Sequence, residues 1–156
     1  MRKSWLLVVV LAACSSSRPP YDDKLVSPAV KGLKVGVSTL DEVTKAFPDG
    51  KVEKDKSLGG EGVVQYNDHP AISVHAPGFD GYVIAGKLAQ FEMKAPGACE
   101  WLVSTVGAMK GSTDCPGNRK MGANKDHTSA SYCASGSGGV VWIDCRGDSI
   151  DYRLDM

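Results

Sequence analysis

The sequence lacks an apolar run long enough to cross a lipid bilayer as a helix. Its longest run, 5–13, has nine residues, whereas a spanning helix needs about 20. An excess of charge of one sign is also absent, with 18 basic and 18 acidic residues. This balance argues against a nucleic-acid partner and against electrostatic docking on anionic lipid. Aromatic residues are few and the 18 glycines are abundant, which favours a chain of strands and turns.

Motifs for catalysis and cofactor binding are missing as well. The sequence has no H-x-x-x-H pair, no G-x-S-x-G elbow and no phosphate-binding loop with its lysine. Asp68, His69 and His75 form a conceivable metal site, but a solvated turn and strand edge explains them better. Arg146-Gly147-Asp148 spells a cell-adhesion tripeptide and is expected to be a hairpin turn. We therefore predict no enzyme, no metal and no cofactor.

The N-terminus has the pattern of an export signal. Basic residues 2–3 precede the apolar run, which ends in Leu11-Ala12-Ala13-Cys14. These four residues resemble the lipobox of bacterial lipoproteins. The resemblance implies that Cys14 is joined to diacylglycerol, that residues 1–13 are removed and that the new amine takes a fatty acid such as palmitate. An ordinary cleaved signal with an incidental cysteine is the alternative.

The mature chain of 143 residues fits one domain. It carries 16 basic and 18 acidic residues once residues 1–13 are removed. We expect residues 14–28 to form a flexible tether and residues 29–156 to form the domain. In lipoproteins of bacteria with two membranes, aspartate directly after the acylated cysteine marks retention at the inner membrane. Ser15 stands there instead, which favours a periplasm-facing location at the outer membrane.

Four cysteines remain in the second half of the chain, namely Cys99, Cys115, Cys133 and Cys145. An even number in an exported protein predicts two disulfides. Zinc is the alternative, but no C-x-x-C pair is present.

The first helix is expected at residues 40–47. Thr39 and Glu42 form a capping box, and Leu40, Val43 and Phe47 share one face. Pro48-Asp49-Gly50 ends the helix.

This helix resembles a signature of the SmpA/OmlA outer-membrane lipoproteins. The matching pattern is Thr39-x-x-Glu42-Val43-x-x-Ala46-Phe47, and it is also similar to the wider group that shares the fold of the β-lactamase inhibitor protein. The chain departs from the pattern by one extra residue between Gly36 and Thr39 and by its exit sequence. The resemblance implies an α+β fold and a role in outer-membrane assembly or integrity.

The rest of the chain predicts strands around a second helix at Ala98–Lys110, whose inner stripe contains Cys99, Leu102, Val106 and Met109. The hairpin within Tyr82–Lys94 is expected to turn at Ala85-Gly86-Lys87. The strands are expected at Lys51–Lys54, Val63–Tyr66, Ala71–His75, Tyr82–Lys94, Ser129–Ala134, Val140–Cys145 and Ser149–Leu154.

The two halves of the domain are alike. A shift of 61 residues, from Gly86 to Gly147, places Ala89, Phe91 and Met93 on Ile150, Tyr152 and Leu154. We therefore predict a two-layer α+β fold, with two short helices on an antiparallel sheet and candidate repeats at 29–94 and 95–156. Chance similarity between two amphipathic hairpins is the alternative.

Strand parity suggests the disulfide pairing. If the apolar side chains of 149–154 face the helices, their hairpin partner Cys145 does too. Cys99 lies on the inner stripe of the second helix, so we predict Cys99–Cys145 and, by elimination, Cys115–Cys133.

The opposite face of the last hairpin is a candidate partner-binding surface. Trp142 alternates there with Val140 and Asp144, Asp151 and Arg153 lie across from it, and Tyr132 is expected to join from the next strand. The alternative is that a loop such as Gly111–Asn124 covers Trp142.

The sequence thus predicts a non-enzymatic envelope lipoprotein, held to the membrane through Cys14, that binds another protein. Two alternatives remain: a periplasmic lipoprotein that inhibits an enzyme, and a ligand-binding or hydrolytic lipoprotein.

Overall fold

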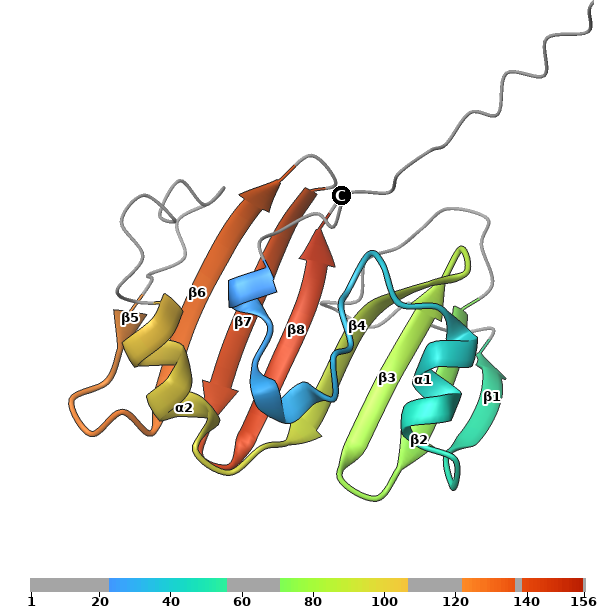
Figure 1. Ribbon diagram of the computed structural model, residues 1–156, viewed down its shortest axis with the longest axis horizontal. Coiled ribbons are helices and arrows are strands. Elements are labelled where there is room, and N and C mark those ends of the chain that lie inside the picture. Colours follow the sequence, from blue (N-terminus) through green and yellow to red (C-terminus); the bar gives the residue numbers. More distant parts are fainter. Residues whose placement is uncertain (1–22, 56–70, 107–121, 137–138, 156) are drawn as a thin grey trace, which may run out of the picture.

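A computed structural model describes residues 23–55, 71–106, 122–136 and 139–155. Its main feature is one eight-stranded antiparallel sheet, in the order β1-β2-β3-β4-β8-β7-β6-β5 (Figure 1). The strands are β1 (Lys51–Asp55), β2 (Ala71–Ala76), β3 (Phe79–Ile84), β4 (Lys87–Lys94), β5 (Gly122–Ala123), β6 (Ser129–Gly136), β7 (Gly139–Arg146) and β8 (Ser149–Asp155). The fold is therefore mixed α+β, with the sheet as its larger part.

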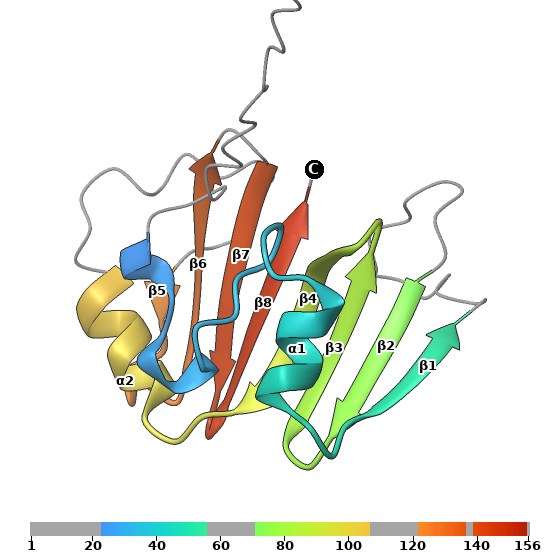
Figure 2. The ribbon, with the colours of Figure 1, turned by 45° about the vertical axis from the view of Figure 1, so that its right-hand side comes forward.

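The helices cover one side of this sheet, which we call the helix side (Figure 2). They are α1 (Leu40–Ala46) and α2 (Ala98–Trp101), with η3 (Leu102–Val106), a π-helical turn, continuing α2. The predicted second helix thus changes its winding after Trp101, and the part of it beyond residue 106 lies outside the described residues. Within the described parts of the chain, no helix is long and apolar enough to span a membrane.

Local sequence signals explain α1 and the hairpin of β3 and β4. The Glu42 amide donates to Thr39 Oγ1 and the Thr39 amide donates to Glu42 Oε2, so the predicted capping box is confirmed. Ala85 and Gly86 both have positive φ, at 49° and 77°. Two successive positive φ values are typical of the turn that joins two strands with a two-residue loop.

The predicted hairpin begins at Phe79, three residues before the expected Tyr82. The other predicted strands are confirmed within one or two residues, except Val63–Tyr66, which lies outside the described residues. One detail of the expected alternation is wrong. A register shift between β3 and β4 inserts Ala89 as an extra residue between Leu88 and Gln90. Ala89 consequently packs in a separate small cluster with Ala71 and Ile84, whereas Phe91 and Met93 face the main core.

Residues 23–38 form an extended segment that crosses the helix side between the two helices, and we call it the strap (Figure 1). It contains η1 (Asp23–Leu25) and η2 (Pro28–Val30). Its buried apolar side chains are Leu25, Val30, Leu33 and Val35. The tether boundary predicted at residue 28 is therefore wrong, because residues 23–28 already pack into the domain. The sequence did not reveal this packing, because the apolar residues of the strap stand among Ser, Pro and Lys without the periodic spacing of a helix or a strand.

A row of four aromatic rings connects the two halves of the core. Phe47, after α1, stacks on Phe79 of β3 at 4.0 Å between ring centroids. Phe79 is followed by Phe91 of β4 at 5.9 Å and then by Tyr152 of β8 at a further 5.1 Å. A Cβ atom added to Gly81 would lie 2.6 Å from Cζ of Phe79. This glycine therefore leaves the space that the row occupies.

The aromatic row ends at Tyr152, whose hydroxyl contacts the strap. The Tyr152 hydroxyl donates to the Leu25 carbonyl at 2.8 Å and accepts from the Ser27 amide at 2.9 Å, and Tyr152 is fully buried. Two backbone groups of the strap thus depend on one side chain in the middle of the sheet.

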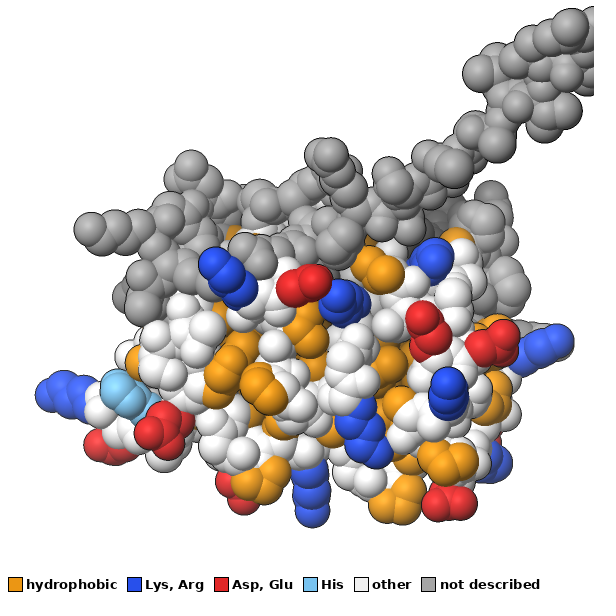
Figure 3. All heavy atoms as spheres, in the orientation of Figure 1, with side chains coloured by type: hydrophobic (Ala, Val, Ile, Leu, Met, Phe, Trp, Pro, Cys, Tyr) orange, Lys and Arg blue, Asp and Glu red, His pale blue; other side chains and the backbone are white. Residues whose placement is uncertain are grey.

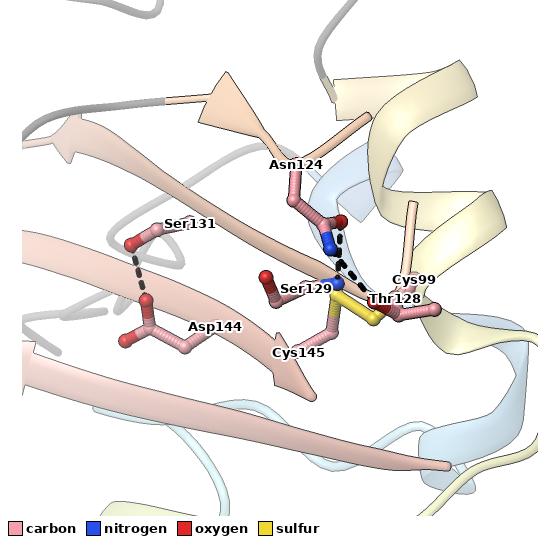
Figure 4. The surroundings of a disulfide bond; sticks show 7 residues. All are labelled: Cys99, Asn124, Thr128, Ser129, Ser131, Asp144 and Cys145. Atoms are coloured by element: carbon pink, nitrogen blue, oxygen red, sulfur yellow. Dashed lines mark hydrogen bonds between the residues drawn. A yellow bond between two sulfur atoms is a disulfide. The ribbon is translucent and has the colours of Figure 1, made fainter. Parts of the chain in front are cut away.

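The predicted Cys99–Cys145 disulfide is confirmed (Figure 4). It joins α2 to β7 on the helix side, as strand parity required. Cys133 is also disulfide-bonded, which favours disulfides over zinc. Cys115, its predicted partner, lies outside the described residues.

We expect Tyr152→Phe to lower the free energy of unfolding by about 1–3 kcal/mol, because it leaves the buried Ser27 amide and Leu25 carbonyl without their partner. Urea unfolding followed by circular dichroism measures the change. Tyr82→Phe, which removes a hydroxyl from a half-buried residue of β3, is the matched control and is expected to change stability by less than about 0.5 kcal/mol. Equal effects of the two variants would show that the strap does not depend on Tyr152.

Candidate functional site

The face of the sheet opposite the helices carries polar and charged side chains, and we call it the open face. Strand alternation places every second residue there, because successive side chains point to opposite faces. On β8, for example, Ile150, Tyr152 and Leu154 are buried in the main core, whereas Asp151 and Arg153 lie on the open face.

Four carboxylates lie in one line across the open face, and we call them the acidic row. The strand register pairs Asp80 of β3 with Glu92 of β4, Glu92 with Asp151 of β8, and Asp151 with Asp144 of β7. Directly opposed like charges destabilise neighbouring strands. The alignment of these four carboxylates is therefore unfavourable for the stability of the sheet.

Polar partners flank the acidic row at both ends. His75 Nδ1 of β2 lies 2.6 Å from Asp80 Oδ1. At the other end, the Ser131 hydroxyl of β6 hydrogen-bonds to Asp144 (Figure 4). The row and its partners therefore extend from β2 to β6.

A hollow of about 560 Å³, open to solvent, lies along the β7 and β8 part of the row. Glu92, Asp144 and Asp151 line it together with Arg146 and Arg153. Because the hollow is wide and open to solvent, it suits a protruding side chain of a partner better than an enclosed small molecule.

Asp151 is the most perturbed acid of the row. Burial raises the pKa of its carboxyl to about 6, and the negative charges of Asp144 and Glu92 act in the same direction. A hydrogen bond from Gln90 Nε2, at 3.2 Å, and the positive charge of Arg153 both lower this pKa. The centre of the row thus changes its charge just below neutral pH.

Two of the residues predicted for partner binding, Asp151 and Arg153, do lie on the open face. Tyr132 does not, because it pairs with Ile143 and packs against the main core on the helix side. The prediction that Tyr132 joins this surface is therefore wrong. An aromatic residue in a strand can serve either face, and only the register with β7 decides which.

Trp142 lies on the open face but only 4% of its surface is exposed. Its indole N–H donates to the Asp155 carboxylate, and it pairs with the buried, disulfide-bonded Cys133. The interpretation of Trp142 as an exposed anchor is thus wrong. Residues 111–121, which the sequence suggested as its cover, lie outside the described residues.

The sequence did not reveal Asp80 and Glu92 as candidates. Each is an ordinary acidic residue in its own strand, and only the pairing of β4 with β8 brings them into line with Asp144 and Asp151. The 61-residue shift was nevertheless a usable sequence signal, because it relates β4 to β8, the two strands that pair at the centre of the acidic row.

Among the described residues, no group of three or more His, Cys, Asp or Glu side chains is arranged to hold a metal ion. Asp68 and His69 lie outside the described residues, while His75 pairs with Asp80. Arg146-Gly147-Asp148 lies at the turn between β7 and β8, where Gly147 has a φ of 56°, as predicted for a hairpin turn.

Comparisons with protein-family models, curated proteins and solved structures found no match to this chain.

We expect Asp151→Asn to stabilise the protein at pH 7.5 by about 1–3 kcal/mol, since a pKa raised from 3.8 to about 6 makes the ionised form costly in the folded state. In the wild type, the folded state holds this proton more tightly than the unfolded state. Stability therefore falls as the pH rises from about 4 to about 6, and the full cost is present above pH 6.

Chemical denaturation between pH 4 and pH 8 measures the effect. The difference between Asp151→Asn and wild type should vanish near pH 4. Asp49→Asn, at an exposed position, is the control and should follow the wild type. A stabilisation that is independent of pH would contradict the assignment of this proton to Asp151.

Proposed function

We propose that this chain is a lipid-anchored cell-envelope protein without enzymatic activity, and that it binds another protein through the open face of its sheet. The observation that carries the proposal is the acidic row, with two exposed carboxylates at Asp80 and Glu92 and two half-buried ones at Asp144 and Asp151. Aligned carboxylates attract a partner that presents lysine or arginine side chains, and such charges set specificity and association rate.

The distribution of the residues supports a binding role for this face. The helices and the strap cover the apolar residues on the helix side of the sheet. Among the described residues, no helix lies on the open face (Figure 2). Two arginines, Arg146 and Arg153, border the acidic residues in the hollow. A partner surface with mixed charge, predominantly basic, complements this arrangement.

The anchor in this proposal is Cys14, which lies outside the described residues. Its support is the lipobox-like sequence and the disulfide chemistry of the domain. Disulfides persist in oxidising compartments such as the periplasm. The Cys99–Cys145 disulfide is therefore in keeping with an exported protein. The location at the outer membrane rests on Ser15 and on the resemblance to the SmpA/OmlA lipoproteins.

The fold in this proposal is a tandem α-β repeat like that of the β-lactamase inhibitor group. The strand order supports it, because β1 to β4 and β5 to β8 each follow a helix and meet through their last strands. The register supports it as well. Phe91 pairs with Tyr152, which is its equivalent under the 61-residue shift. On either side of this pair, Gln90 pairs with Arg153 and Glu92 pairs with Asp151. Because the shift relates Gln90 to Asp151 and Glu92 to Arg153, it converts each of these two pairs into the other.

The same strand order favours a second candidate function, a periplasmic inhibitor that uses the open face to block an enzyme. The two functions differ in the partner. Capture of proteins of the outer-membrane assembly machinery supports the first, and capture of a soluble enzyme supports the second.

We expect the double variant Asp80→Lys, Glu92→Lys to reduce capture of the partner from cell envelopes by about tenfold or more, because it reverses two charges of the acidic row. Crosslinking, affinity purification and quantitative mass spectrometry measure the captured protein. Asp49→Lys with Asp126→Lys, at two exposed positions outside the row, gives the same change in net charge and should capture as the wild type does. Equal capture by both double variants would show that the acidic row does not bind the partner.

A further inference from the structure

We propose that the strap fixes the orientation of the domain on the membrane, with the helix side against the lipid surface and the open face directed away from it. This inference rests on the proposed lipid anchor at Cys14. It adds to the proposed function which surface of the domain meets lipid and which is left for a protein partner.

The first step is the place where the chain leaves the domain. Asp23, the first described residue, forms an ion pair with Lys34 of the same strap at 2.6 Å. Leu25 is buried and its carbonyl binds the Tyr152 hydroxyl. Since η1 contacts η3, which contacts β6, the point of departure is held on the helix side.

The second step is the reach of the chain between anchor and domain. Eight residues lie between Cys14 and Asp23. The nine steps from one Cα atom to the next that join them span at most about 30 Å even when the chain is fully extended. With the helix side against lipid, the anchor lies next to the point of departure and this reach is ample.

The opposite orientation uses most of the reach. The chain would first have to pass over β5, the one strand between β6 and the nearer sheet edge, which adds about 5 Å. It would then have to descend past the sheet, about 10 Å below the helix layer, and past the side chains of the open face. Such a path leaves the chain little slack, which restricts its conformations and is entropically costly.

The third step is charge. The helix side carries exposed groups of both signs, such as Lys31 and Lys45 beside Asp41 and Glu42, as Figure 3 shows for the whole of this side. It therefore lies against anionic lipid without strong repulsion. The acidic row, in contrast, is repelled by the phosphates of an anionic surface. Val52 is the one large apolar side chain that is exposed among the described residues, so we expect contact with the lipid surface rather than insertion into it.

Fluorescence quenching on vesicles tests the orientation. The full lipidated protein is reconstituted in phosphatidylethanolamine vesicles with about one fifth phosphatidylglycerol, a mixture that gives an anionic surface, and with a trace of lipid that bears a quencher on its head group. A dye is attached through an amino acid with a bioorthogonal side chain that replaces either Lys45, on the helix side, or Lys94, on the open face. Both are exposed lysines, so the two variants are matched in charge.

We expect the dye at position 45 to be quenched several-fold more than the dye at position 94. A flexible Gly/Ser insertion of about 20 residues after Ser17 should strongly reduce this difference while vesicle binding persists, because about 20 residues add far more reach than the path around the sheet needs. Equal quenching in the wild-type chain, or stronger quenching at position 94, would overturn the orientation. An undiminished difference after the insertion would overturn the claim that the strap fixes it.

Intact mass and vesicle flotation separate this inference from the proposed function. A mature chain without acyl groups, or one that does not float with the vesicles, would overturn the anchor and the orientation together. A chain that is acylated and floats, but shows no difference between the two positions, overturns the orientation alone.

Discussion

The structure depends on the contact between the Tyr152 hydroxyl and the backbone of the strap. One buried hydroxyl satisfies the Leu25 carbonyl and the Ser27 amide, and without it both groups would lie in the core without a partner. The contact brings residues more than 120 positions apart in the sequence together. Through it, the strap, which is the first described segment of the chain, is bound to the central strands of the sheet.

The aromatic row explains why Tyr152 is held in place. Its ring stacks on Phe91, and the row continues through Phe79 to Phe47 at the end of α1. Lys31 of the strap lies 4.2 Å from the centroid of the Phe47 ring, where a cation interacts favourably with an aromatic face. The strap is thus fixed at both ends of the row. All three phenylalanines of the sequence serve this arrangement, which shows how a chain poor in aromatic residues still builds a continuous core.

The two faces of the sheet differ in composition. The helix side contains the strap, the disulfide between α2 and β7 and nearly all of the apolar core. The open face carries the acidic row, where burial, together with the charges of Asp144 and Glu92, disfavours the ionised form of Asp151. Groups that destabilise the folded state in this way are frequent at functional sites, which supports the proposal that this face binds a partner.

The sequence predicted those features that depend on local patterns. The capping box of α1, the turn at Ala85-Gly86 and most strands follow from short-range preferences, and strand parity was sufficient to pair Cys99 with Cys145. Features set by long-range register were missed. The face on which Tyr132 lies, the bulge at Ala89 and the alignment of Asp80 and Glu92 with Asp144 and Asp151 all require knowledge of which strands pair and at which residue. The docking of 23–28 was missed because its partner, Tyr152, is encoded at the far end of the chain.

Hydrogen exchange at the Ser27 amide tests the central claim most directly. If this amide is bound to the Tyr152 hydroxyl in a fully buried site, it is released only when the whole domain unfolds. The account predicts that it exchanges at the same rate as the amides of β8 that pair with β4, and that both slow down together as the protein is stabilised. Fast exchange at Ser27 while the β8 amides remain protected would contradict the account, because the strap would then separate from the sheet without unfolding it.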